Sequence, residues 1–218
     1  FVTPRLAESV TASDYYGNPA KKMSVVRINV TKGKTTTAVL ISAMLKAAGE
    51  KVAQIGTLGT IAEGYCQEKT LTTPDPIALH QVLFDLHQKG FTHIVMEASS
   101  HAIHKSRVAD VAFNFTVFTN LSPEHLDYHG TMADYFQAKL KLFTALPRTA
   151  TDIVNMETDY GQAIFDKCAV PVVTIALEKT GDVFFKDYQI SLARIHGTIQ
   201  AGEITNTDDS LLKSKDKG

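Results

Sequence analysis

The chain has 218 residues, of which 44% are hydrophobic, so it is long enough to form one sizeable α/β domain or two small ones. Its 22 Lys and Arg residues nearly balance its 23 Asp and Glu residues, which excludes the basic field that attracts nucleic acid or an anionic membrane and favours a small-molecule partner. No apolar run reaches the roughly 18 residues of a membrane helix, and no signal-peptide pattern precedes the first expected strand.

Short β-branched runs alternate with longer helical runs, a pattern typical of βα units around a mainly parallel sheet. The predicted strands cover residues 24–30, 52–56, 92–97, 115–119, 152–155 and 172–176. Apolar residues at three- and four-residue spacing predict helices over residues 35–48, 78–89 and 132–146. The predicted fold class is α/β, with a P-loop-type, mainly parallel sheet flanked by helices.

The character of the sequence changes after about residue 181, where short strand-like runs are separated by glycine or charge. These runs cover residues 183–185, 190–192 and 198–200. We expect an α/β domain over residues 1–180, a small antiparallel β appendage of the same domain over 181–205, and a polar tail over 206–218.

Cysteine use indicates a reducing compartment. Cys66 and Cys168 lie about 100 residues apart with no CxxC pairing, which argues against a disulfide framework and a thiolate metal site and favours the cytoplasm. The chain begins at Phe1 rather than methionine, so we expect it to be a piece of a longer protein.

The stretch VTKGKTTT, residues 30–37, lies between an apolar strand and a helix. In that context, backbone N–H groups at the helix N-terminus point at an anion, Lys34 supplies a cation for β- and γ-phosphates, and the Thr35 hydroxyl can reach Mg²⁺. The alternative is a lysine and an N-capping threonine that open an ordinary helix. The residues of this stretch leave both interpretations open.

Glu97 ends the predicted strand 92–97, at the carboxyl edge where ligands of open α/β sheets bind. A second Mg²⁺ ligand belongs at this edge. The alternative is a structural glutamate that caps the following turn through Ser99 or Ser100.

Histidines cluster after this strand, at His101, His104, His125 and His129. Their spacings of three and four could indicate zinc, but neither pair forms a clear helical ligand motif and no cysteine joins them. For His125, a place near Mg²⁺ competes with a turn-stabilising hydrogen bond. The pattern around Lys139 is that of a solvated surface lysine on a helix.

Several longer strings occur in a characteristic order: YGNP (16–19), GKTTT (33–37), IGTLGT (55–60), TTPDP (72–76), MEASSHAIHKSRV (96–108) and VFTNLSPEHLDYHGTMADYFQAKLKLF (117–143). Together they resemble the central, ATP-binding domain of the Mur ligases, from about residue 7 to about residue 176. This resemblance implies a cytoplasmic, ATP-dependent, amide-forming enzyme of peptidoglycan synthesis. Within the family, the strings are most similar to the ligases that add the third amino acid to UDP-N-acetylmuramoyl-L-alanyl-D-glutamate (UDP-MurNAc-L-Ala-D-Glu).

The resemblance also implies roles for individual residues. ATP would be bound by Thr31, Lys32, Gly33, Lys34, Thr35, Thr36 and Asn155. Mg²⁺ would be held by Thr35, Glu97, His125 and a carbamylated Lys139, and the catalytic residues would be Lys34, His125 and Lys139. The muramoyl peptide would be contacted by Thr72, Thr73, Ser99, Lys105 and Arg107.

The implied chemistry has two steps. The D-glutamyl carboxylate attacks the γ-phosphorus of ATP and gives an acyl phosphate and ADP, and the amine of diaminopimelate or lysine then displaces phosphate. Both steps concentrate negative charge, which Lys34, Mg²⁺ and its ligands would offset. The family also implies N- and C-terminal domains, which this sequence does not show, so we expect the chain to be incomplete as an enzyme.

The chain departs from the family pattern within the loop. Aligned on Lys34, it has Arg27, Val30 and Lys32 where the family has Gly, Gly and Asn. Forcing Val30 into a glycine-like conformation would cost roughly 1–3 kcal/mol. Other departures are Leu71, Lys105 and the pair Glu157 and Thr158.

These departures define two hypotheses. The first is the central domain of a ligase, and the second is a degenerate module that binds nucleotide or the UDP-muramoyl peptide without catalysis. A third hypothesis, an unrelated P-loop kinase or GTPase, is weaker because the chain has no guanine-reading Asn-Lys-x-Asp and the other strings would stay unexplained.

Overall fold

The computed structural model of the chain describes residues 3–67, 71–99, 102–103, 105–123, 131–144, 146–177, 181–190 and 195–202. Its strands are β1 (Ser24–Ile28), β2 (Val52–Gly56), β3 (Gly59–Ala62), β4 (Tyr65–Gln67), β5 (His93–Glu97), β6 (Phe115–Phe118), β7 (Thr151–Asn155), β8 (Val172–Ala176), β9 (Val183–Ile190) and β10 (Ile195–Ala201). Its helices are α1 (Pro4–Tyr15), the 3₁₀ helix η1 (Pro19–Lys22), α2 (Lys34–Ala47), α3 (Pro76–Gln88), α6 (Met132–Thr144) and α7 (Asp159–Lys167). No helix in these residues has the length and apolar character needed to cross a membrane.

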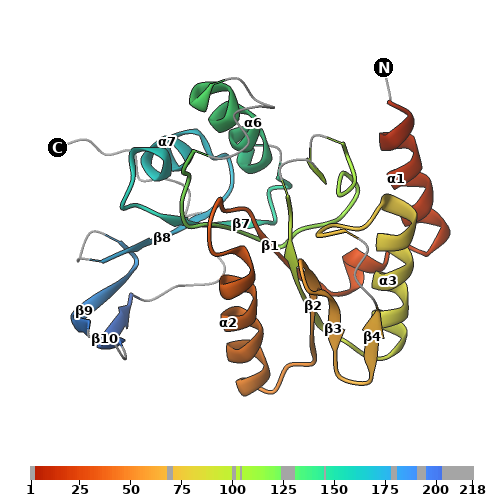
Figure 1. The fold of residues 1–218 in the computed structure, drawn as a ribbon, viewed down its shortest axis with the longest axis horizontal. Coiled ribbons are helices and arrows are strands. Elements are labelled where there is room, and N and C mark those ends of the chain that lie inside the picture. The colour runs from red at the N-terminus through yellow and green to blue at the C-terminus, as the bar shows by residue number, and fades with distance from the viewer. Residues whose placement is uncertain are drawn as a thin grey trace.

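The described strands form one sheet in the order β10-β9-β8-β7-β6-β1-β5-β2-β3-β4 (Figure 1). The pairs from β2 to β9 are parallel, whereas β3 and β4 add an antiparallel edge at one side and β10 pairs antiparallel with β9 at the other. The predicted α/β class and the antiparallel β appendage are therefore confirmed. The hairpin is continuous with the main sheet, because β9 pairs with β8.

Helices cover the two faces of the sheet unequally. On one face, α3 packs over β1, β2 and β5 with α1 against it, while α6 and α7 pack over β6, β7 and β8. On the other face, α2 is the one helix among the described residues that contributes to the buried cluster around Ile28, Val95 and Val117. In Figure 1, α6 and α7 lie above strands β7 and β8, and α2 lies below them.

Helix α1 and the β3 hairpin were not predicted from periodicity, because capping and turn residues define them instead. Helix α1 begins with Thr3, whose side chain accepts a hydrogen bond from the Leu6 N–H, and with Pro4 at the first helical position. It buries only small residues, Ser9, Ala12 and Ser13, so it has no apolar stripe to recognise. The hairpin of β3 begins at Gly59, which pairs with Gly56 across a short turn.

A buried arginine and a buried aspartate lie in one row across the sheet. Arg27 on β1 and Asp152 on β7 both align with Thr116 on β6, so their side chains share a face. The Arg27 guanidinium lies 4.7 Å from the centre of the Phe113 ring, and the Cys168 thiol donates a 2.9 Å hydrogen bond to Asp152. Burial lowers the pKa of Arg27 to about 10, against the opposing effect of the Asp152 charge. Burial also raises the pKa of Asp152 to about 7.

This raised pKa makes the stability of the fold depend on pH. Because the folded chain keeps a proton on Asp152 that the unfolded chain releases, the free energy of unfolding should fall as pH rises from about 4 to about 7, by up to about 1.4 kcal/mol per pH unit. Denaturant titrations of the wild type and Asp152→Asn measure this effect. We expect their difference in unfolding free energy to decline across this range and to level off above about pH 7. A constant difference would contradict the prediction.

Candidate functional site

The carboxylate of Glu97 is the centre of a hydrogen-bond network at the carboxyl end of β5. Glu97 is fully buried, and its Oε2 accepts hydrogen bonds from the Thr35 hydroxyl at 3.1 Å and from the Thr57 hydroxyl at 3.0 Å. The Thr57 N–H donates to Oε1 at 3.2 Å. Glu97 therefore joins the first turn of α2 to the turn after β2.

This network bears on two alternative interpretations of the sequence, the N-capping threonine and the turn-capping glutamate. Helix α2 is capped by Gly33, in a left-handed conformation with φ of 86°, so Thr35 is not its N-cap. The Thr35 hydroxyl instead donates to Glu97. The described contacts of the Glu97 carboxylate are with Thr35 and Thr57 rather than with Ser99, whose hydroxyl accepts from the Ala102 N–H.

A glycine makes room for the carboxylate. Gly56, the last residue of β2, lies so close to Glu97 that an added Cβ would overlap Oε1, Cδ and Cγ of the glutamate. The close approach of the two strand ends therefore requires a residue without a side chain at this position.

The side chain of Lys34 folds back over the loop that precedes it. Its Nζ donates to the carbonyl oxygens of Val30 at 3.1 Å and of Thr31 at 2.8 Å. The Lys32 N–H donates to Asn120 Oδ1 at 3.0 Å, and Asn120 Nδ2 donates back to the Lys32 carbonyl at 2.9 Å. Asn120, which follows β6, thus fixes the loop from the side.

Val30 is accommodated without the strain that its place in the loop predicts. Among the described residues, the non-glycine residues with positive φ are Asn18 and Ser106, so Val30 does not take a glycine-like conformation. Its side chain is 1% exposed and joins the apolar cluster under α2. Val30 therefore does not carry the strain that a glycine-like conformation would cause, because its side chain packs in the core instead.

Lys139 is buried rather than solvated. It is 3% exposed, and its Nζ lies 5.1 Å from the centre of the Tyr135 ring, one turn earlier on α6. The hydroxyl of Tyr135 lies 3.4 Å from Thr31 Oγ1, which also accepts from the Ser122 N–H. A continuous series of contacts therefore runs from Lys139 through Tyr135 and Thr31 to Lys34.

Three of the residues predicted to bind the muramoyl peptide meet beside this network. The Thr73 hydroxyl donates to the backbone carbonyl of Glu97 at 3.1 Å and accepts from the Ser99 N–H at 3.4 Å. Arg107 Nη1 donates to the Thr73 carbonyl at 3.2 Å, while its buried Nε has no hydrogen-bond partner within the described part of the chain. Thr72 precedes this cluster, and Lys105 is exposed.

Asn155 lies on the other side of the loop, at the end of β7. Its Nδ2 donates to the Thr119 carbonyl at 2.8 Å and its Oδ1 accepts from the Glu157 N–H at 3.1 Å. It also lines a cavity of about 460 Å³ beside β8 and β9. Thr36 is exposed on the first turn of α2, next to Thr35.

The predicted histidine ligand His125 lies outside the described residues, as do Ser100, His101, His104 and His129. The zinc hypothesis for these histidines therefore stays untested. Within the described part of the chain, no group of three or more His, Cys, Asp or Glu side chains could hold a metal ion.

Sequence reasoning missed three contributors to the site, Thr57, Asn120 and Tyr135. Thr57 belongs to the IGTLGT string and directly follows the predicted strand 52–56, and this position at a strand end could have indicated a site residue. Tyr135 fits the apolar stripe of α6, so its hydroxyl contact with the loop had no separate signal. Asn120 lies 88 residues from Lys32, and the contact between them depends on strand order.

Comparisons with known proteins relate the sequence and the fold of this chain to one family. The sequence pattern of the family described as Mur ligase middle domain matches residues 31–212. A UDP-N-acetylmuramoyl-L-alanyl-D-glutamate--2,6-diaminopimelate ligase of Pseudomonas putida is 43% identical over 153 residues, which are 70% of this chain and 31% of that protein. The chain spans 29% to 39% of the length of eight curated relatives.

Solved structures share the fold. The solved structure of a ligase of the same name superimposes on this chain with a TM-score of 0.78 at 24% identity. The superposition covers 92% of this chain and 42% of the chain in that structure. A MurF ligase from Thermotoga maritima, solved in complex with ADP, superimposes with a TM-score of 0.67 at 16% identity and covers 92% of this chain and 43% of its own.

Replacing Gly56 tests the packing of the site. Gly56→Ala should displace the buried Glu97 carboxylate and lower the free energy of unfolding by about 1–3 kcal/mol, because the methyl group enters occupied space. Gly202→Ala is the matched control, since an added Cβ there meets Asp182 at an ordinary 3.6 Å. Denaturant unfolding measures both variants. Equal stability of the two would show that Glu97 moves aside at little cost.

Proposed function

We propose that this chain, which belongs to the Mur ligase family through its middle domain, binds ATP and Mg²⁺ as the nucleotide-binding part of an acid–amino-acid ligase. The single observation that carries the proposal is the series of contacts that joins Lys139, Tyr135, Thr31 and the loop to Lys34. From the adjacent Thr35 the series continues to Glu97. It links two lysines, three hydroxyls and a buried carboxylate to the start of one helix.

The loop is suited to a triphosphate. The N-terminus of α2 provides backbone N–H groups and a positive dipole end, and Lys34 provides a mobile cation next to it. In the described conformation, the ammonium of Lys34 rests on two loop carbonyls, which are weaker partners than a phosphate. Phosphate binding would draw the ammonium away from these carbonyls.

The oxygen donors of the site fit Mg²⁺. This ion prefers hard oxygen ligands, and the Thr35 hydroxyl and the Glu97 carboxylate are 3.1 Å apart. When bound, Mg²⁺ would offset the charge that develops on the transferred phosphoryl group. His125 is a further proposed ligand.

The burial of Lys139 supports its proposed carbamylation. An ammonium buried near a metal site would be opposed by desolvation and by like charge, whereas a carbamate presents oxygen donors and a negative charge. Carbamate formation joins the neutral amine to carbon dioxide and releases one proton.

We propose UDP-MurNAc-L-Ala-D-Glu as the acid substrate, at the cluster of Thr73, Ser99 and Arg107. The buried, unpartnered Nε of Arg107 is a donor suited to a carboxylate. In the proposed reaction, the D-glutamyl carboxylate attacks the γ-phosphorus with departure of ADP, and the amine of diaminopimelate or lysine displaces phosphate to form the amide. Because the chain spans about a third of its relatives, further domains would complete this reaction in the cytoplasm.

A second candidate function is a module that keeps the fold without catalysis. It is favoured by the internal bonding of the loop, in which Lys34 and the Lys32 N–H already have protein partners. Val30 lies in the core in place of a glycine that could approach a phosphate.

Calorimetric titration separates the two candidates. We expect a non-hydrolysable ATP analogue to bind this chain in a Mg²⁺-dependent manner, and Lys34→Ala to weaken binding by roughly 10- to 100-fold through loss of a charge-assisted contact. Absence of heat at millimolar nucleotide, in a chain whose circular dichroism shows it folded, would favour the non-catalytic module.

The proposed role of Lys139 is tested by mass and by affinity. In bicarbonate buffer at mildly alkaline pH, native mass spectrometry should show the added mass of one carbon dioxide, and Lys139→Ala should lose it. The same variant should weaken Mg²⁺–nucleotide binding by about 10- to 100-fold. Lys46→Ala, at an exposed position on α2, is the control and should leave both readouts unchanged. Unchanged mass and affinity in Lys139→Ala would refute the role.

A further inference from the structure

A cavity of about 250 Å³ lies on the face of the sheet that α3 and α6 cover. Arg27 on β1 lines it from the sheet, Leu146 and Pro147 line it from the segment after α6, and residues between 103 and 113 supply the remaining described wall. None of these described lining residues belongs to the proposed nucleotide, metal or muramoyl-peptide sites. The cavity is therefore distinct from the site at the carboxyl edge.

The wall of this cavity is mostly apolar. Apart from one guanidinium and one serine, the described residues that line it have apolar side chains. Val108, Val111 and Phe113 belong to the buried cluster under α3, and Leu146 packs against that cluster. At roughly 30 Å³ for each water, the volume corresponds to about eight water molecules. The cavity thus suits a compact ligand with a hydrocarbon part.

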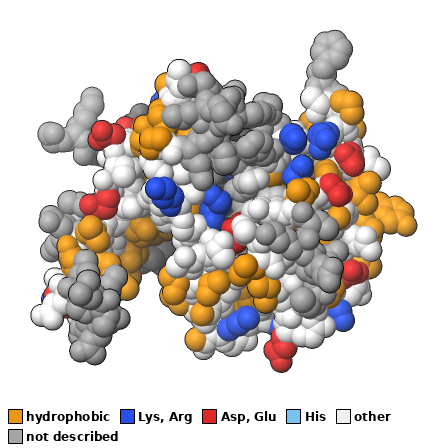
Figure 2. Space-filling view, viewed as in Figure 1, with side chains coloured by type: hydrophobic (Ala, Val, Ile, Leu, Met, Phe, Trp, Pro, Cys, Tyr) orange, Lys and Arg blue, Asp and Glu red, His pale blue; other side chains and the backbone are white. Residues whose placement is uncertain are grey.

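The charged side chain among the described lining residues is that of Arg27. It is 4% exposed, and its guanidinium lies 4.7 Å from the centre of the Phe113 ring, which lines the same cavity. Figure 2 shows other Lys and Arg side chains at the surface of the visible face, where water solvates them. Because charges interact more strongly away from water, a buried guanidinium attracts an anion more strongly than these surface groups do.

The protein interior supplies Arg27 with a negative charge only in part. The charge of Asp152 opposes the effect of burial on the pKa of Arg27. Burial raises the pKa of Asp152 itself to about 7, so near neutral pH a large share of the molecules carry a neutral carboxyl group there. An anion in the cavity would add the charge that Asp152 supplies incompletely.

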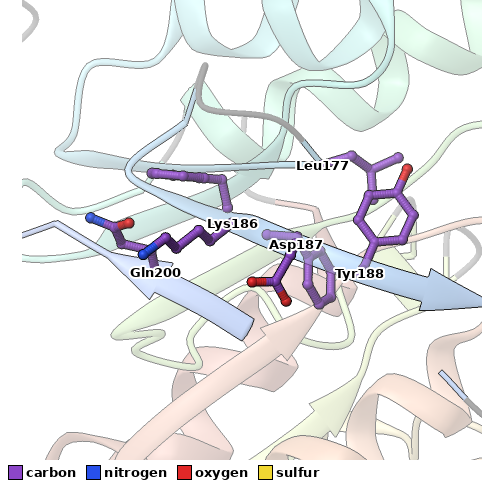
Figure 3. Close-up of a pocket in the computed structure, with 7 residues that line it drawn as sticks. Leu177, Lys186, Asp187, Tyr188 and Gln200 are labelled. Atoms are coloured by element: carbon purple, nitrogen blue, oxygen red, sulfur yellow. The ribbon is translucent and has the colours of Figure 1, made fainter. Parts of the chain in front are cut away.

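The hollow along β9 lacks this combination of burial and charge in its described lining. It has a volume of about 570 Å³, and Figure 3 shows Lys186 and Gln200 toward one end, with Leu177 and Tyr188 toward the other. Its charged side chains, Lys186 and Asp187, are both exposed. Solvent therefore screens them, and they attract an anion only weakly.

We propose that the cavity beside Arg27 binds a small organic monoanion, a monocarboxylate with a compact hydrocarbon body. The planar guanidinium matches a carboxylate through two parallel hydrogen bonds, which few other donors can offer. The hydrocarbon body would pack against Val108, Val111 and Leu146, and the Ser106 hydroxyl lies in the same wall as a further donor. Benzoate, which combines a carboxylate with a flat apolar ring, is a suitable probe.

Nuclear magnetic resonance titration of the ¹⁵N-labelled 218-residue chain with sodium benzoate tests the proposal. We expect saturable shifts of the Ala109, Val111 and Phe113 amide signals, with a Kd below about 1 mM. Benzamide has the same shape without the charge, so it should bind at least about tenfold more weakly. Absence of saturable shifts at about 10 mM benzoate, or equal binding of benzamide, would overturn the proposal. Shifts confined to residues 33–37 would place the anion at the start of α2 and overturn it as well.

Substitutions separate the buried cation from general electrostatic attraction. Arg27→Met should weaken benzoate binding at least about tenfold, and an apolar side chain of similar length in place of a buried ion is often tolerated by a fold, which circular dichroism checks. Arg148→Met is the matched control, because it removes the same charge from an exposed position next to Pro147 at the cavity wall and should change the affinity less than about twofold.

Asp152→Asn gives a readout of opposite sign. Because it removes the carboxylate that competes for Arg27, it should strengthen benzoate binding by about two- to tenfold. Weaker binding in this variant, or equal losses in Arg27→Met and Arg148→Met, would contradict the proposal. If Arg27→Met does not fold, the comparison of benzoate with benzamide on the wild type still decides the role of charge. Neither readout requires nucleotide, so failure here and failure of the proposed ATP site are distinguishable.

Discussion

The architecture of the site depends on one fully buried carboxylate. Glu97 is isolated from water at the end of β5, and such a group is stable there only because hydroxyl and backbone donors surround it. Thr35 and Thr57 supply those donors from two other segments, and Gly56 leaves the space. The carboxylate thus fixes the first turn of α2 relative to β2, and the position of the loop follows from that turn.

The loop shows how a fold tolerates an unusual sequence at its centre. Val30 is stabilised as a core residue beneath α2, and the carbonyl groups near it accept hydrogen bonds from Lys34. Tyr135 approaches from α6 and contacts Thr31, which brings the buried Lys139 toward the same region. The elements that we propose to bind the anion are therefore joined by contacts, although the Lys34 ammonium is bonded to loop carbonyls in this conformation.

The carboxyl edge of the sheet and its α2 face differ in character. At the carboxyl edge, strand ends from β1, β2, β5 and β6 meet around the loop, as expected of ligand sites in open parallel sheets. On the side of α2, strands β7, β8 and β9 leave apolar side chains partly exposed. The chain thus combines a polar, tightly packed edge with a partly exposed apolar face.

The sequence by itself determined the α/β class, the positions of six of the parallel strands and of helices α2, α3 and α6, and the family. Periodicity and strand–loop–helix motifs are local patterns, so they can be read from the sequence without knowledge of the fold. Only the tertiary structure decided that Lys139 is buried, that Glu97 bonds to Thr35 and Thr57, and that Asp152 lies in one row with Arg27. Burial, pKa and hydrogen-bond partner depend on which distant segments come into contact, and that is set by strand order and helix packing rather than by local pattern.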